Sequence, residues 1–152
     1  MAWLYLTLKF LHVLAAIIAV GFNATYAIWL VRGQRDPAHL DFALRGVKFL
    51  DDYVANPAYI ALAITGLSMF FIAGYPLTTF WLDAAAILFI IVAILGFGFY
   101  TPTLSKQIRA LAASGAESAE YRALSARGTV VGAVLGVLVV VIVLLMVTKP
   151  TF

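Results

Sequence analysis

Four long apolar stretches dominate the chain, and each of them is long enough to cross a lipid bilayer. The hydrocarbon core of a bilayer is about 30 Å thick, and a helix that rises about 1.5 Å per residue needs roughly 20 residues to span it. The stretches are approximately Leu4–Val31, Ala55–Tyr75, Phe80–Tyr100 and Thr129–Thr148. Charged residues make up 11% of the 152 residues, whereas soluble domains contain about 25%. The sequence therefore predicts one all-α domain over residues 1–152, a polytopic four-helix bundle in the membrane.

The segment between the first two stretches has the pattern of an amphipathic helix. Between Pro37 and Val54, apolar residues recur at helical spacing and charged residues lie on the opposite side. We expect a helix that lies at the membrane interface or extends the second span. Proline dipeptides mark the expected helix boundaries, with starts at Asp36-Pro37 and Asn56-Pro57 and stops at Thr101-Pro102 and Lys149-Pro150.

The sequence contains no cysteine, and its formal net charge is only +3. Without cysteine the chain cannot form disulfides or thiolate metal sites. The basic residues are spread over the loops instead of forming one cluster, which argues against nucleic-acid binding. The expected partner is the lipid bilayer, and the sequence leaves open a homodimer or a larger membrane complex.

Lysine and arginine are distributed unequally between the loops, which predicts an orientation in the membrane. The loops after the first and third spans carry these residues and the short second loop carries none: Arg32, Arg35, Arg45 and Lys48 in loop one, and Lys106, Arg109, Arg122 and Arg127 in loop three. Loops rich in lysine and arginine stay in the cytoplasm. We therefore expect a multi-pass protein of the bacterial inner membrane, with loops one and three cytoplasmic and both termini outside. Lys9 and Lys149 oppose this orientation but are outnumbered.

His12 is an ionisable residue within the first span, where such a group is costly unless it has a function. It lies about eight residues, or about 12 Å, below the expected outer end of the span. Mostly small or polar residues share its helix face or flank it: Tyr5, Ala15, Ala16, Ala19, Asn23 and Tyr26. Small residues either admit a neighbouring helix or leave room for a flat cofactor. A neutral histidine that is hydrogen-bonded to another helix explains His12 as well as a ligand does.

A haem ligated by His12 requires a second ligand or an open position at the same depth. His39 lies beyond about 28 Å of helix from His12, so one chain cannot place both histidines on one haem. Met69 lies about 9 Å below the same outer face, and Met/His ligation is a known haem pattern. A methionine in an apolar span also serves as plain packing. Copper is an alternative metal for this pair, but the sequence has no Met-rich or multi-His cluster to hold it.

Other polar residues of the spans have simpler interpretations. Lys9, about one turn outward of His12, either snorkels to the headgroups or neutralises a haem propionate. Asn23 and Tyr26 are expected to form hydrogen bonds between helices. Asp83, near the outer end of the third span, is an interfacial carboxylate that could also pair with Lys9.

Two further patterns lie toward the loops. Asp51-Asp52 and the pair Glu117 and Glu120 are expected on solvated segments, where they do not form catalytic pairs. The stretch Gly132–Gly136 allows close helix approach, either within the bundle or in a dimer.

The opening LKFLHVLAAIIAVGF, the stretch FWLDAAAILFI and the closing MVTKP resemble an uncharacterised bacterial four-helix integral membrane family. That family is similar to copper-resistance protein D and to the haem-containing membrane protoporphyrinogen oxidases, and the similarity covers most of the chain in layout. In the oxidases the histidine of a similar Leu-Lys-x-x-His opening ligates haem b, and the matching residue here is His12. The oxidases also have a lysine shortly after a Trp-Leu pair, whereas Trp81-Leu82 is followed here by Asp83. The resemblance therefore implies a haem b cofactor more than an oxidase reaction.

The leading hypothesis is a small membrane b-type haem protein for electron transfer or for haem-linked redox chemistry or sensing. His12 is its expected iron ligand, and Met69, Lys9 and Asn23 are the other candidate residues around the cofactor. The second hypothesis is a cofactor-free structural or accessory membrane protein in which His12 bonds to another helix. The third is copper or small-solute handling, and the sequence does not decide whether the chain is an enzyme.

Overall fold

The computed structural model describes residues 2–150, and the regular elements in this range are all helical. The α-helices are α1 (Ala2–Arg35), α2 (Leu40–Leu50), α3 (Asn56–Ala73), α4 (Phe80–Leu95), α5 (Thr101–Ser114) and α6 (Ala119–Thr148). A 3-10 turn, Pro37–His39, precedes α2. A first π-turn, Asp51–Ala55, joins α2 to α3, and a second π-turn, Gly96–Tyr100, joins α4 to α5. The predicted all-α membrane bundle is confirmed.

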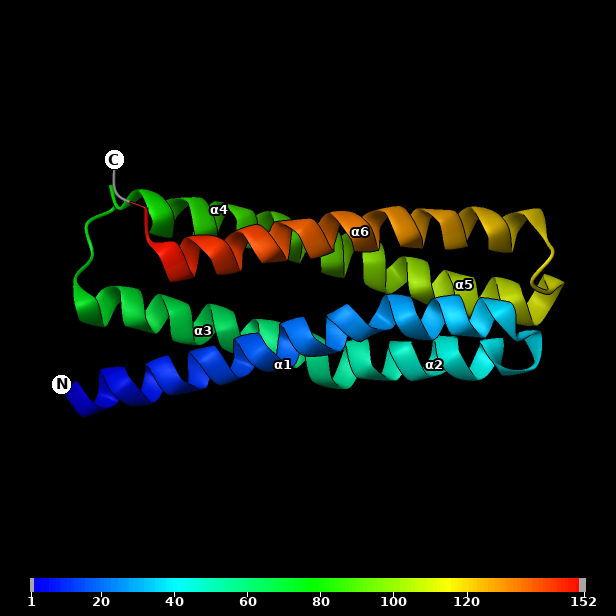
Figure 1. Cartoon of the computed structure of the whole chain (residues 1–152), viewed down its shortest axis with the longest axis horizontal. Coiled ribbons are helices and arrows are strands. Elements are labelled where there is room, and N and C mark those ends of the chain that lie inside the picture. Colours follow the sequence, from blue (N-terminus) through cyan, green and yellow to red (C-terminus); the bar gives the residue numbers. More distant parts are fainter. Residues whose placement is uncertain (1, 151–152) are drawn as a thin grey trace.

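The helices form an elongated antiparallel bundle with two different ends (Figure 1). The start of α1, the end of α6 and the 74–79 loop lie at one end, which we call the termini end. The turns before α2 and after α5 lie at the other end, the far end. The helical segments that are long and apolar enough to cross a membrane are Ala2–Arg35, Pro37–Ala73, Phe80–Ser114 and Ala119–Thr148, of 30 to 37 residues each. Because a bilayer core needs only about 20 helical residues, the bundle extends well beyond the core.

The helix α3 begins at Asn56 as predicted, but no break precedes it, and the stop predicted at Thr101-Pro102 is wrong because the helical path runs on into α5. The chain continues through Asn56-Pro57 from α2 into α3, and through Thr101-Pro102 from α4 into α5. Proline lacks a backbone N–H, and its ring collides with the carbonyl of the preceding helical turn. A π-turn accommodates this conflict before each proline: the N–H of Asn56 bonds to the Asp51 carbonyl, and the N–H of Thr101 bonds to the Gly96 carbonyl. The amphipathic segment therefore extends the second span, and α5 extends the third in the same way.

The membrane half of the bundle consists of two helix pairs, α1 with α3 and α4 with α6 (Figure 1). The pairs are joined chiefly toward the far end, where α2 packs on both α1 and α5, and α5 packs on α6. The larger buried cluster includes residues of α2 and α5, among them Leu44, Val47 and Leu104. The membrane half has a smaller cluster, formed by Ala15, Ala19, Ala58 and Leu62. The far half is thus packed like a soluble bundle, whereas the membrane half depends on contacts within each pair.

Aromatic rings at the termini end connect the 74–79 loop and α6 to the start of α4. The ring of Tyr75 packs edge-on against Trp81, with 5.9 Å between the centroids. The Nζ of Lys149 lies 5.3 Å from the centroid of the same Trp81 ring. Lys149 adopts a left-handed conformation, with φ of 44°, directly after the end of α6. The helix stop predicted at Lys149-Pro150 is therefore confirmed.

Candidate functional site

His12 of α1 is hydrogen-bonded to α3 through one ring nitrogen. Its Nδ1 lies 2.9 Å from the Oγ1 of Thr65. The Thr65 hydroxyl in turn donates to carbonyls of its own helix, with Oγ1 2.6 Å from the oxygen of Ala61 and 3.3 Å from that of Leu62. A hydroxyl has a single hydrogen, so with that hydrogen donated to a carbonyl Thr65 accepts the bond from His12. In the neutral ring this network assigns the proton to Nδ1 and a lone pair to Nε2, to which no described residue donates a hydrogen bond.

Gly66 allows the His12 ring to approach the backbone of α3. A Cβ atom at Gly66 would lie 3.1 Å from Cε1 and 3.6 Å from Nδ1 of His12. Any larger residue at this position would push the ring away from Thr65. Sequence reasoning did not identify Thr65 and Gly66, because their pairing with His12 depends on the register between α1 and α3.

The alanines on the His12 face bring α1 close to α3. Ala15 and Ala19 are buried in one cluster with Ala58 and Leu62. Of the two uses expected for these small residues, close approach of a neighbouring helix is the one that the structure shows. Phe89 of α4 also packs against this cluster, and so the cluster links the two helix pairs.

Met69 and Lys9 both lie closer to the termini end than His12 does. Met69 is half-buried on α3, four residues after Thr65, which corresponds to about 6 Å along the helix. Residues four apart share a helix face, so Met69 lies on the same side of α3 as Thr65. Lys9 is exposed and forms no ion pair with any described residue, Asp83 included. The ligand role of Met69 and the propionate role of Lys9 stay predictions.

Asn23 forms the predicted hydrogen bond between helices, and Tyr26 does not. The Nδ2 of Asn23 donates to the phenolic oxygen of Tyr59 on α3 at 2.7 Å. Tyr26 is 4% exposed, and its hydroxyl has no hydrogen-bond partner among the described residues. Its ring instead stacks on Tyr100 of the second π-turn, with 6.4 Å between centroids and 8° between planes. The prediction for Tyr26 is wrong because this residue faces the π-turn and not a polar group of α3.

His39 and the stretch Gly132–Gly136 lie outside the His12 site. His39 is exposed near the far end, where its Nδ1 lies 2.7 Å from the Asp36 carboxylate, and it is therefore remote from His12. A Cβ atom at Gly132 would lie 3.3 Å from the Tyr100 ring, so this glycine allows close packing within the bundle. At Gly136 no described atom outside the local helix backbone lies within 4 Å of such a position.

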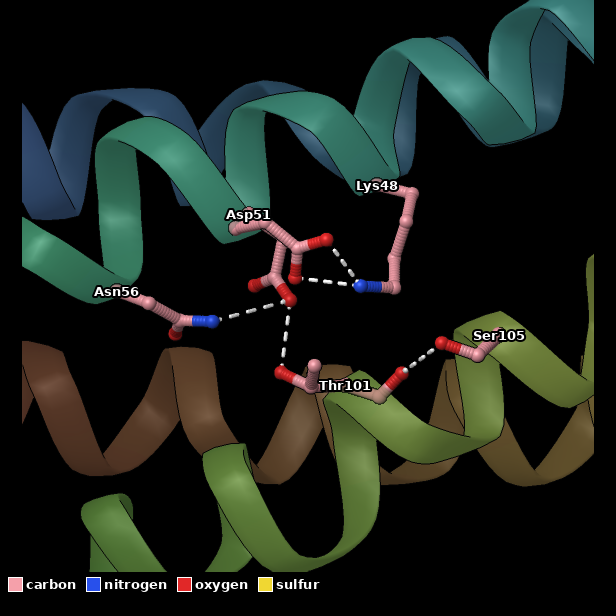
Figure 2. A network of polar contacts seen from close by, with 6 residues as sticks. Lys48, Asp51, Asn56, Thr101 and Ser105 are labelled. Carbon is pink, nitrogen blue, oxygen red and sulfur yellow. Dashed lines mark hydrogen bonds and ion pairs between the residues drawn. The ribbon is translucent and has the colours of Figure 1, made fainter.

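Asp51 contradicts the prediction of a solvated carboxylate, because it is only 4% exposed. It accepts hydrogen bonds from the Oγ1 of Thr101 at 2.7 Å and from the Nδ2 of Asn56 at 3.4 Å (Figure 2). The sequence did contain a signal for its burial: Asp51 follows Val47 by four residues and Leu44 by seven, which places it on the apolar face of α2. The prediction treated Asp51 and Asp52 as one acidic pair, although only Asp51 lies on the apolar face.

Asp52 remains on the charged face and forms an ion pair with Lys48. The side chain of Asp52 is 36% exposed and that of Lys48 is 20% exposed, so this pair has access to solvent. Glu117 is exposed and pairs with Arg122, and Glu120 is exposed as well, as predicted for solvated segments.

The described residues contain no group of three or more His, Cys, Asp or Glu residues that could hold a metal ion. A copper site built from protein side chains normally needs several ligands of this kind or of methionine. Haem differs, because the porphyrin supplies four ligands and the protein only the axial ones. The finding concerns clusters of these four residue types and does not bear on haem.

Comparison with known proteins assigns a family. The model of the family described as predicted integral membrane protein (DUF2269) matches residues 6–150. No curated protein and no solved structure shows a significant match to the chain.

Proposed function

The chain belongs to this family of predicted integral membrane proteins, and on that premise we propose that it is a small b-type haem protein with His12 as an axial ligand. The haem would supply reversible one-electron chemistry, used for electron transfer or for redox sensing. The protein would hold the porphyrin in its membrane half, where water is scarce.

The observation that carries the proposal is the tautomer of His12. Histidines that bind a metal through one ring nitrogen usually donate a hydrogen bond from the other, which fixes the orientation of the ring. In this chain Nδ1 donates to Thr65 at 2.9 Å, and the Nε2 lone pair receives no bond from a described residue. In its neutral form the imidazole therefore presents the Nε2 lone pair, with its ring orientation fixed by Thr65, as a metal requires.

The donor chemistry of the neighbouring residues fits a haem. Met69 has a thioether on the Thr65 side of α3, about 6 Å along the helix from Thr65, and is the candidate for the sixth ligand. Lys9 is an exposed cation on α1 toward the termini end, suited to a propionate. Asn23 is bonded to Tyr59, so its contribution would be to hold α1 against α3 near the cofactor.

The arrangement of the helix pairs also supports the proposal. In the membrane half α1 packs on α3 and α4 packs on α6, whereas the connections between the pairs lie chiefly toward the far end. A flat cofactor between the pairs would leave these far-end connections unchanged. It would take the place of the contact that Phe89 of α4 makes with the α1–α3 cluster.

A second candidate is a cofactor-free structural or accessory protein, and the same hydrogen bond favours it. The bond to Thr65 and the close contact with Gly66 already give His12 a complete role in holding α1 to α3. On this account the substitution His12→Ala would lower the stability of the bundle and would have no effect on any cofactor.

Titration of the haem-free protein with haemin distinguishes the two candidates. We expect the wild type to bind haemin at a saturating ratio with a sharp Soret band, and His12→Ala to lose this binding. Thr65→Val keeps the imidazole but removes its orienting acceptor, and should weaken binding by about 10- to 100-fold. His39→Ala is the matched control and should bind as the wild type does.

The proposal is overturned if His12→Ala binds haemin as tightly as the wild type. It is also overturned if the folded wild type does not bind haemin in a saturable way, while His12→Ala unfolds more easily than His39→Ala. The second result would establish the structural role.

A further inference from the structure

The carboxyl group of Asp51 is buried without a cation bonded to it. Lys48 is close enough to act on Asp51 electrostatically, but its ion pair is with Asp52. The three groups together carry a formal charge of −1 if both carboxylates are ionised. A buried carboxylate is costly unless it is paired with a cation or takes up a proton.

The position of Asp51 is at the junction of the membrane half and the far half. It precedes Ala73, the end of α3, by 22 residues, which corresponds to about 33 Å of helix. A bilayer core of about 30 Å measured from the termini end would therefore stop just short of it. The partly exposed Lys48 and Asp52 side chains connect this position to solvent on the far side.

The hydrogen bonds of Asp51 join the two irregular points of the bundle. Asp51 begins the first π-turn, and Thr101 directly follows the second. Figure 2 shows the Thr101 hydroxyl and the Asn56 amide both directed at the carboxyl of Asp51. Single π-turns within helices are found frequently at functional sites, and here two of them face each other across one hydrogen bond.

A second observation points to the same place. The hydroxyl of Tyr26 is buried without a hydrogen-bond partner among residues 2–150, and it interacts electrostatically with both Asp51 and Asp52. An unpaired buried hydroxyl is unfavourable unless it acquires a partner in some state of the protein. The titratable groups that interact with Asp51 come from five elements: Tyr26 from α1, Lys48 from α2, Asp52 from the first π-turn, Tyr59 from α3 and Tyr100 from the second π-turn.

We propose that Asp51 is a proton-binding site, and that protonation of its carboxyl group exchanges the hydrogen bond between the two π-turns. In the ionised state the Thr101 hydroxyl donates to Asp51. In the protonated state the carboxyl carries the hydrogen and donates to the Thr101 oxygen, so the Thr101 hydrogen must move to another acceptor. Pro102 has no N–H, which leaves a carbonyl of the preceding turn without its helical donor and available to Thr101. The exchange needs only one proton, which enters by way of the partly exposed Lys48 and Asp52 side chains.

Infrared spectroscopy of the full chain in lipid nanodiscs tests the proposal, because a protonated carboxyl has a C=O stretch that is separate from the carboxylate bands. We expect the wild type to keep one such band at pH values at which exposed carboxyls are ionised. The band should titrate away at higher pH and be absent in Asp51→Asn. Asp41→Asn is the matched control, since Asp41 is an exposed carboxylate paired with Arg45 at 2.7 Å, and it should keep the band.

A second variant keeps the test decisive if Asp51→Asn does not fold. Thr101→Val retains the carboxyl but removes the donor that favours its ionised form, so the titration midpoint should rise by about one pH unit. Thr103 is a buried threonine on the same helix, and Thr103→Val should leave the midpoint unchanged.

The proposal is overturned if the wild type shows no such band, if the band persists in Asp51→Asn, or if its midpoint follows the sodium concentration at fixed ionic strength. The last result would assign the site to a metal cation.

Discussion

The close contact between α1 and α2 predicts that replacing glycine by alanine has different effects on stability at Gly33 and at Gly46. A Cβ atom at Gly33 would lie 2.9 Å from the Cβ of Ala43 and 3.3 Å from Cδ1 of Leu40. A Cβ atom at Gly46 of α2 would have no atom of residues 2–150 within 4 Å apart from its own helix backbone. Both glycines have negative φ, so alanine fits the backbone at either site and only the space around the new methyl group differs.

The magnitudes follow from two terms. Alanine is favoured over glycine within a helix by about 1 kcal/mol, and this gain applies to both positions. Overpacking a close contact costs about 1–3 kcal/mol, and this cost applies at Gly33 alone. Gly46→Ala should therefore stabilise the protein by up to about 1 kcal/mol, while Gly33→Ala should be neutral or destabilising by up to about 2 kcal/mol.

The measurement is reversible unfolding in mixed micelles of increasing SDS content, followed by far-ultraviolet circular dichroism. The difference between the two variants isolates the overpacking cost, because the helix-propensity gain largely cancels. Equal stabilisation by both substitutions would refute the close approach of α1 to α2 at Gly33, and with it the antiparallel packing of the far half.

The other predictions concern topology, the sixth ligand and the bond between α1 and α3. Cysteines introduced at Ser114, at the far end, and at Thr78, in the 74–79 loop, should react with impermeant reagents from the cytoplasmic and outer sides respectively; the reverse labelling would contradict the orientation. Met69→Leu in the haem-loaded protein should convert low-spin reduced haem to a high-spin form that binds carbon monoxide faster, and an unchanged spectrum would assign Met69 to packing. Asn23→Leu should lower the stability by about 0.6 kcal/mol, and by at most about 1.7 kcal/mol, in the same micelle assay; no loss would argue against the bond to Tyr59.

The sequence predicts the number and nature of the long helices because bilayer thickness imposes a length that hydropathy reveals directly. It does not predict how far the helices continue. Asn56-Pro57 and Thr101-Pro102 have the appearance of boundaries, since proline normally interrupts a helix. π-turns carry the helices through these prolines, and the hydrogen bond from Thr101 to Asp51 beside them joins the second and third long helices, which local sequence does not encode.

The candidate site was predicted only in part, for a similar reason. His12 and Asn23 were identified because polar residues are rare in apolar spans, but their partners on α3 follow from the register of two helices. The spacing of Asp51 after Leu44 and Val47 is enough to predict that Asp51 is buried. Its hydrogen bond to Thr101 cannot be predicted from local sequence, because the two residues are 50 positions apart.

The optical spectrum of the protein purified from haem-replete cells tests the central claim, haem binding at His12, most directly. We predict a Soret band in the oxidised protein and sharp alpha and beta bands after reduction, all of which are lost in His12→Ala and retained in His39→Ala. A folded wild-type protein that remains colourless under these conditions would contradict the assignment and leave His12 as the hydrogen-bonded contact between α1 and α3.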